Sequence, residues 1–266
     1  MSQTTPNLNQ LFENAQNEGL LSTTSMQALN VTDIGAEIQA GLGISIDDVT
    51  TSEVVLVTIM PDDSSSIRFS GNAQAVRGGH NAILDALSVT AQRDSILIHN
   101  RYLNGHVLYP YCGLDQAQRM TPQNYDPNQG TPLYDQTVVL LGTVLAKAQE
   151  FENNGIPVRT ITLIITDGAD QHSQRSRPGD VAALVNDLLR HENHIVAAMG
   201  IDDSSGGDYF RSVFKQMGIR DEWVLTPGNS DREIQKAFQV FSQSAVRLSQ
   251  SASSFSHSGL GGFGQS

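Results

Sequence analysis

Residues 54–66 read Val-Val-Leu-Val-Thr-Ile-Met-Pro-Asp-Asp-Ser-Ser-Ser, and this stretch organises the rest of the chain. Its first part is apolar and β-branched without alternation, which predicts a strand over about 53–60 that is covered on both faces. Pro61 ends the strand because proline cannot donate to a sheet ladder. Asp62, Ser64 and Ser66 follow at two-residue spacing, so a tight loop can bring their oxygens together. Such hard oxygen ligands suit Mg²⁺ or Mn²⁺.

Two more oxygen donors stand at comparable places later in the chain. Thr131 lies in Gly130-Thr131-Pro132, just before a long helical pattern, and Asp167 ends a second buried strand that begins near residue 160. Taken alone, residues 62–66 favour a solvated turn that hydrogen-bonds to itself. Thr131 and Asp167 favour the metal-site interpretation, because each stands at a strand end or a helix start.

The set of Asp-x-Ser-x-Ser, then Thr, then Asp resembles the metal-ion-dependent adhesion site (MIDAS) of von Willebrand factor A (vWA) domains. All five positions are filled, and the resemblance covers about residues 53–248. It implies that the hydroxyls of Ser64, Ser66 and Thr131 bind Mg²⁺ or Mn²⁺, and that Asp62 and Asp167 act directly or through water. Neutral hydroxyls leave much of the ion's charge uncompensated, so the open position favours a carboxylate from a partner protein.

Strand-like and helix-like segments alternate along the chain, which predicts an α/β fold. The expected architecture is a doubly wound, mostly parallel sheet with helices on both faces. Asn104-Gly105 lies between two strand-like runs, and it predicts one antiparallel edge hairpin with a type I′ turn. Ligands of such sheets bind beyond the carboxyl ends of the strands, where Asp62 and Asp167 are expected.

Several features near these motifs carry expectations of their own. Residues 67–80 contain three glycines and are predicted to be an extended loop, an insertion that reshapes the rim of the site. Gly130 is expected to let the backbone approach the ion. Asp63 and His172 are expected to be exposed or merely near the site. Residues 202–206, Asp-Asp-Ser-Ser-Gly, partly copy the first motif but lack its last serine, so they are not expected to bind metal.

The chain divides into three predicted parts. Residues 1–50 form a helical extension, either a docking element for a partner or a lead-in that packs on the main domain. Residues 51–248 form the vWA-like domain, and residues 249–266 form a flexible Ser/Gly-rich tail without charged side chains. An alternative for the tail is a short peptide that a partner recognises through Phe255, Leu260 and Phe263.

Composition narrows the functional class. The 266 residues carry a net charge of −12, which argues against nucleic-acid or anionic-membrane surfaces because these need clustered Lys and Arg. Cys112 is the single cysteine, so no intramolecular disulfide is possible. Neither a signal-peptide pattern nor a bilayer-length apolar stretch is visible. These features predict a cytoplasmic protein of the intracellular vWA type.

The expected function is a non-enzymatic, metal-dependent protein-interaction module that binds a partner's Asp or Glu. The resemblance implies a partner such as an AAA+ ATPase or another member of a multi-protein assembly. A metal-dependent hydrolase or phosphatase-like enzyme is an alternative, and so is a structural, self-assembling protein. Ser64 stands where a haloacid-dehalogenase-like phosphatase needs a second Asp, and no P-loop or Gly-x-Ser-x-Gly motif is present.

Overall fold

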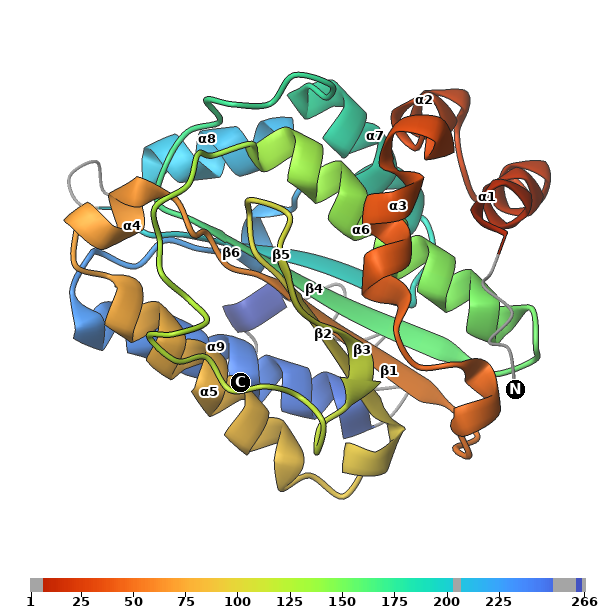
Figure 1. Cartoon of the computed structure of the whole chain (residues 1–266), viewed down its shortest axis with the longest axis horizontal. Coiled ribbons are helices and arrows are strands. Elements are labelled where there is room, and N and C mark those ends of the chain that lie inside the picture. Colours follow the sequence, from red (N-terminus) through yellow and green to blue (C-terminus); the bar gives the residue numbers. More distant parts are fainter. Residues whose placement is uncertain (1–6, 203–206, 251–261, 265–266) are drawn as a thin grey trace.

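A computed structural model describes residues 7–202, 207–250 and 262–264 of the chain. Within them, six strands form one sheet in the order β3-β2-β1-β4-β5-β6 (Figure 1). Every neighbouring pair is parallel except β2 and β3, which form the antiparallel hairpin at one edge. The expected vWA/Rossmann-like α/β fold is therefore confirmed. The strands are β1 (Val54–Met60), β2 (Ile96–Arg101), β3 (Val107–Gly113), β4 (Val158–Thr166), β5 (His194–Gly200) and β6 (Val224–Leu225).

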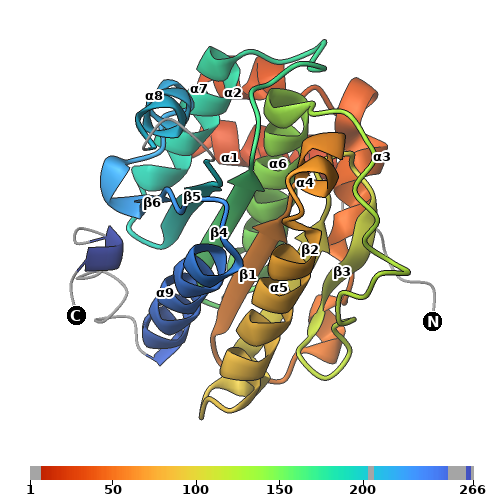
Figure 2. The same cartoon turned by 90° about the vertical axis from the view of Figure 1, so that its left-hand side faces the viewer.

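Helices cover both faces of the sheet, with α5 and α9 on one face and α6 and α7 on the other (Figures 1 and 2). The α-helices are α1 (Leu8–Asn17), α2 (Thr23–Ala28), α3 (Val31–Leu42), α4 (Ser65–Phe69), α5 (Ala73–Ser88), α6 (Leu133–Glu152), α7 (Pro178–Leu189), α8 (Asp208–Gln216) and α9 (Asp231–Gln250). Short 3₁₀ turns are η1 (Ile46–Asp48), η2 (Arg93–Ser95), η3 (Asp221–Trp223) and η4 (Gly262–Gly264). None of the described helices is both long and apolar enough to cross a membrane.

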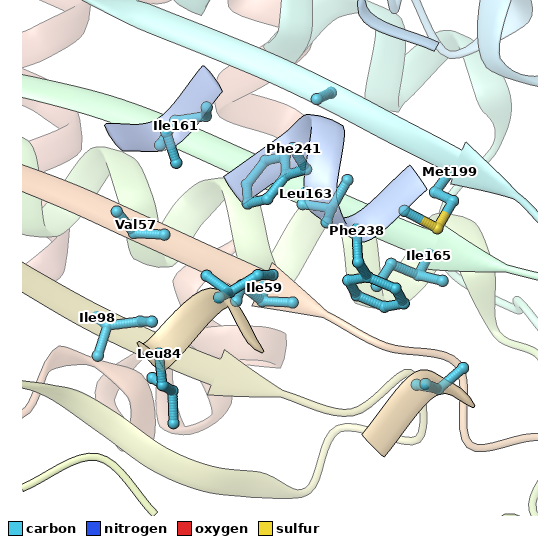
Figure 3. Packing of buried hydrophobic residues seen from close by; sticks show 14 of the residues in the cluster. Val57, Ile59, Leu84, Ile98, Ile161, Leu163, Ile165, Met199, Phe238 and Phe241 are labelled. Carbon is cyan, nitrogen blue, oxygen red and sulfur yellow. The ribbon is translucent and has the colours of Figure 1, made fainter. Parts of the chain in front are cut away.

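The core has two layers because side chains of a strand point alternately to the two faces of the sheet. Val57 and Ile59 of β1 pack toward α5 and α9, where they meet Phe238 and Phe241 (Figure 3). Met60, at the end of the same strand, belongs instead to the cluster beneath α6 and α7. Burial on both faces explains why β1 and β4 are apolar without alternation.

The N-terminal helices α1–α3 share the core beneath α6 and α7. Their buried apolar side chains belong to the same cluster as those of α6 and α7, and include Leu8, Phe12, Leu29, Ile38 and Leu42. Gly142 of α6 allows this close packing, since a Cβ there would lie 2.7 Å from Leu29 and 2.9 Å from Ile38. The extension therefore packs on the main domain.

The predicted loop over residues 67–80 is wrong. The chain forms α4 directly after Ser64, turns at Gly71 with φ of +79°, and then forms α5. Gly78 and Gly79 lie inside α5, so they do not break it. Gly79 is required by packing, because a Cβ there would lie 2.1 Å from the ring of Phe238. No insertion therefore separates the serines from the first helix of the sheet.

The hairpin at residues 102–106 is confirmed, but its type I′ turn is wrong. Gly105 has φ of +93°, while no described residue other than glycine has a positive φ. The Gly105 N–H donates to the carbonyl of Tyr102, and the Tyr102 N–H donates to the carbonyl of His106. Asn104 instead uses its side-chain oxygen to accept the N–H of His106 at 2.7 Å. A type I′ turn needs positive φ at both central residues, and Asn104 lacks it.

The tail predicted to be flexible lies mostly outside the described residues, and so do Phe255 and Leu260. Phe263 is described, in η4. Its ring packs against Trp223, with ring centroids 4.9 Å apart, and against Phe241 at 6.5 Å. This part of the tail packs on the domain from which it extends.

Candidate metal centre

Asp62 lies just beyond the end of β1, beside the end of β4. The two strands are paired in parallel, with Met60 opposite Ile164, so residues 62 and 166–167 meet at the same edge of the sheet. Asp62 is fully buried. One carboxylate oxygen accepts the Ser64 N–H at 2.7 Å, and the other accepts the Thr166 hydroxyl at 2.7 Å and the Asp167 N–H at 3.4 Å. Asp62 therefore joins the two loops that carry the other candidate ligands.

Ser64, Ser66 and Asp167 form a continuous chain of side-chain contacts above Asp62. The hydroxyls of Ser64 and Ser66 lie 2.8 Å apart, and the Ser66 hydroxyl donates to Asp167 Oδ1 at 2.5 Å. Ser70 reaches the other oxygen of Asp167 at 3.4 Å. Four of the five candidate residues are thus brought together as the sequence predicted.

Thr131 is placed beside this group by its backbone. Ser64 pairs with Gln129 in an isolated parallel bridge, and the Ser65 N–H donates to the Gln129 carbonyl at 3.1 Å. Thr131 is buried, and its N–H donates to Nδ1 of His172 at 2.8 Å. Within the described chain, no hydrogen bond joins the Thr131 side chain to the other four candidates, so its place beside them rests on the backbone pairing of Ser64 with Gln129.

Asp63 departs from the expectation of exposure, whereas His172 is exposed and near the site as expected. Asp63 is buried and accepts the Asn104 N–H at 3.0 Å, so it supports the hairpin. His172 holds the backbone of Thr131, and Gly130 is small to make room for that imidazole, since a Cβ would lie 2.9 Å from the ring. Residues 203–206 of the partial copy lie outside the described residues, while Asp202 accepts the N–H of Gly207 at 3.0 Å.

Two supporting residues were missed in the sequence. Tyr125 is buried, and its hydroxyl donates to the backbone carbonyl of Asp62. Asp135, in the first turn of α6, accepts the N–H groups of residues 174, 175 and 176 at 2.8, 3.1 and 2.6 Å. An acid in the first turn of a helix is a visible signal. The loop that Asp135 holds lies 39 to 41 residues further along the chain, and nothing in the sequence links the two.

The loop after Asp167 is also held by the N-terminal extension. Glu37 of α3 accepts Nη1 of Arg175 at 2.8 Å and Nε2 of Gln136 at 2.9 Å. The guanidinium of Arg101, buried at the end of β2, donates to the Glu37 backbone carbonyl. These contacts fix α3, the start of α6 and the loop relative to one another.

Burial raises the pKa of the carboxylates of the centre, and the charge of Asp62 adds to this for Asp63 and Asp167. Burial raises the pKa of Asp62, against the hydrogen bonds that it accepts. Burial, with the nearby charge of Asp62, raises the pKa of Asp63 to about 7 and that of Asp167 to about 6. Burial also raises the pKa of Tyr125, with the three carboxylates adding to the effect. Negative charge is concentrated here without a basic side chain among these causes, and a cation would offset it.

The residues fit a small, hard cation. Carboxylates and hydroxyls are the donors that Mg²⁺ prefers, and contacts of 2.5–2.8 Å show that Ser64, Ser66 and Asp167 already converge. Across the described ranges, no group of three or more His, Cys, Asp or Glu side chains is arranged to hold a metal ion. The candidate centre differs from such a group because three of its five residues, Ser64, Ser66 and Thr131, supply hydroxyl oxygens.

No protein-family model matches this chain, and no curated protein matches it. Its fold is similar to the pilus adhesin SpaC from Lactobacillus rhamnosus GG, with a TM-score of 0.53 and 12% identity over 74% of this chain and 31% of SpaC. It is also similar to the PilB minor pilin from Streptococcus sanguinis, with a TM-score of 0.52 and 12% identity over 76% of this chain and 64% of that one. A von Willebrand factor type A structure from Catenulispora acidiphila aligns with a TM-score of 0.49 and 15% identity over 74% of this chain and 44% of that one. The chain thus spans less than two thirds of each, and the likeness concerns the fold alone.

Proposed function

We propose that this protein is a metal-dependent protein-interaction module. Asp62, Ser64, Ser66, Thr131 and Asp167 hold Mg²⁺ or Mn²⁺ in a complete MIDAS-type centre, and the ion binds an Asp or Glu side chain of a partner protein. The observation that carries the proposal is the hydrogen-bonded chain from Ser64 through Ser66 to Asp167, with Asp62 buried beneath it. Neutral hydroxyls leave the bound ion with excess positive charge, which favours an external carboxylate.

A binding role is favoured over catalysis by the donors present. Ser66 donates to Asp167, and Ser64 and Ser66 share a hydrogen bond, so neither hydroxyl is paired with a histidine in the Ser–His arrangement that activates a serine nucleophile. His172 uses Nδ1 to accept a backbone N–H from Thr131. We therefore propose that the protein is not an enzyme, and a metal-dependent phosphatase assay that shows turnover would contradict this.

The proposal extends to the compartment and the partners of the protein. Cys112 is buried and free, as expected in a reducing compartment, and we place the protein in the cytoplasm, as a component of a multi-protein assembly or a partner of an AAA+ ATPase. Localisation of the tagged protein tests the compartment. A pull-down with and without EDTA tests the partner, and the metal-dependent interaction is lost on chelation.

The test of the centre is direct metal binding. Titration of the purified protein with Mg²⁺ and Mn²⁺, followed by calorimetry and by thermal melting, should show one site and a rise in Tm. Ser66→Ala removes a proposed ligand from an exposed position of α4, so it should weaken metal binding at least about tenfold without unfolding the chain.

Ser65→Ala is the matched control. Ser65 is the neighbouring residue in the same short helix, and its hydroxyl only reaches the Gln129 carbonyl, at 3.5 Å. This variant should keep the wild-type affinity for Mg²⁺. Equal affinities of the two alanine variants, or a wild-type Tm that does not respond to either metal, would refute the proposed centre.

A further inference from the structure

A cavity of about 710 Å³ adjoins the candidate metal centre. Ser66 and Asp167 line it and also belong to the centre, so the two are continuous. Its walls come from α4 and α8, which lie at the same end of the sheet in both views of the molecule (Figures 1 and 2). A chain bound to the metal would therefore run next to this cavity.

Two exposed aromatic side chains line the cavity. Phe69 has 85% of its surface exposed and Tyr209 has 44%. Phe69 is three residues after Ser66 in α4, which places the ring on the same side of the helix as the Ser66 hydroxyl. A bound segment that covers the Phe69 ring would remove apolar surface from water, which favours binding.

Apolar groups continue from these rings into the cavity. Ala169 follows Asp167 closely in the chain, and Ile201 and Phe210 are buried side chains whose surfaces also line the cavity. The cavity is lined by polar side chains as well, those of Ser70, Asn72, Asp202 and Asn229. Its apolar part, beside the proposed ion, is complementary to a segment with a carboxylate next to an apolar side chain.

From this geometry we infer the kind of partner that the centre selects: a protein segment with an Asp or Glu directly beside a large apolar residue. The acid binds the metal, and the apolar side chain enters the cavity between Phe69 and Tyr209. The inference rests on the proposed function, and it adds a specificity pocket to the metal centre. Phe69 and Tyr209 are the specificity-determining residues.

Capped peptides test the inference on the full chain in the presence of Mg²⁺, by NMR titration. Gly-Leu-Glu-Leu-Gly offers both groups, Gly-Gly-Glu-Gly-Gly only the acid, and Gly-Leu-Gln-Leu-Gly only the apolar side chains. The first should bind about tenfold tighter than the second, because a Leu side chain becomes covered. The third should bind weakly and should not respond to EDTA.

Variants of the two aromatic residues test whether the cavity causes the tighter binding of the peptide with Leu. Phe69→Ala and Tyr209→Ala should each remove most of the tenfold preference and leave the affinity for Gly-Gly-Glu-Gly-Gly unchanged. Val89→Ala is the matched control, because Val89 is also 85% exposed but follows the C-terminal end of α5, whereas Phe69 precedes the N-terminal end. It should change neither affinity. Phe69 is exposed, so an unchanged Tm should accompany its replacement.

Each other outcome decides a separate point. Equal Mg²⁺-dependent binding of the Leu and Gly peptides overturns the pocket and leaves the proposed function standing. Binding of Gly-Leu-Glu-Leu-Gly without dependence on Mg²⁺ overturns the proposed function. A preference for Gly-Arg-Glu-Arg-Gly over the Leu peptide shows that the cavity accepts basic side chains, and it overturns the apolar assignment. The absence of binding by every peptide overturns both.

Discussion

Three buried histidines make the free energy of unfolding sensitive to acid. Burial lowers the pKa of His80 to about 4 and the pKa values of His99 and His194 to about 3. The unfolded chain binds a proton at each histidine near pH 6.5, while the folded chain stays neutral there. Protonation therefore favours the unfolded state, and stability is lost as the pH falls from about 6.5 toward the folded pKa values.

Replacing one of these histidines should reduce the acid sensitivity. His194 shares a hydrogen bond of 2.8 Å with the hydroxyl of Thr160, and His194→Gln retains a polar group but cannot be protonated. Between pH 7.5 and 5.5, the free energy of unfolding should fall by about 1.4 kcal/mol less in the variant than in the wild type. Urea denaturation at both pH values measures this difference. An identical fall in the two proteins would show that His194 does not contribute.

Single residues also show how far sequence reasoning reaches. Asp62, Ser64, Ser66 and Asp167 could be predicted because their spacing and their places at strand ends are visible in the sequence. Tyr125 could not, because its contact with the Asp62 carbonyl depends on how residues 114–132 fold across the site. His172 was visible only as a lone histidine in a loop, with nothing to indicate its bond to Thr131.

At the scale of elements, α5 shows why glycines in a sequence can lead to a wrong prediction of a loop. Gly78 and Gly79 suggested a loop, yet both lie within the helix, because its buried face, with Val76, Ile83 and Leu87, packs on the sheet and α9. Burial of a helix face can outweigh the helix propensity of single residues. The strands were predicted more accurately, since continuous apolar runs have few other interpretations.

The two neighbouring glycines of α5 should respond oppositely to the same substitution. Gly78 is exposed, and nothing lies within 4 Å of an added Cβ, so Gly78→Ala should stabilise the protein by about 1 kcal/mol. Gly79→Ala places a Cβ 2.1 Å from Phe238, so overpacking should cost roughly 1–3 kcal/mol. Thermal and chemical denaturation of the pair measure both signs. Stabilisation by Gly79→Ala would show that α5 and α9 separate at little cost.

At the scale of the whole molecule, the N-terminal helices belong to the folding unit. Five of their buried apolar side chains contribute about 1.5–3 kcal/mol each, which together is comparable to the stability of an ordinary domain. These side chains are Leu8, Phe12, Leu29, Ile38 and Leu42. The sequence predicted helices here but could not show where they pack, because the apolar face of a helix can pack against any apolar surface.

A chain shortened to residues 51–266 should therefore not fold cooperatively. Circular dichroism and a thermal melt compare it with the full chain, and a sharp transition in the shortened chain would contradict the prediction. Phe12→Ala is the milder variant. Phe12 is buried, so its truncation should cost about 3–5 kcal/mol and lower Tm while the full chain still melts in one step.

The ion pair between Glu37 and Arg175 links the N-terminal helices to the loop beside the candidate centre. Arg175 lies three residues after His172, whose ring accepts the Thr131 N–H, and Glu37 lies on α3. Glu37 also accepts a hydrogen bond from Gln136 in the first turn of α6, the helix that Thr131 precedes. The N-terminal helices therefore help to hold the loop and the helix start beside the candidate centre, although none of the proposed ligands belongs to them.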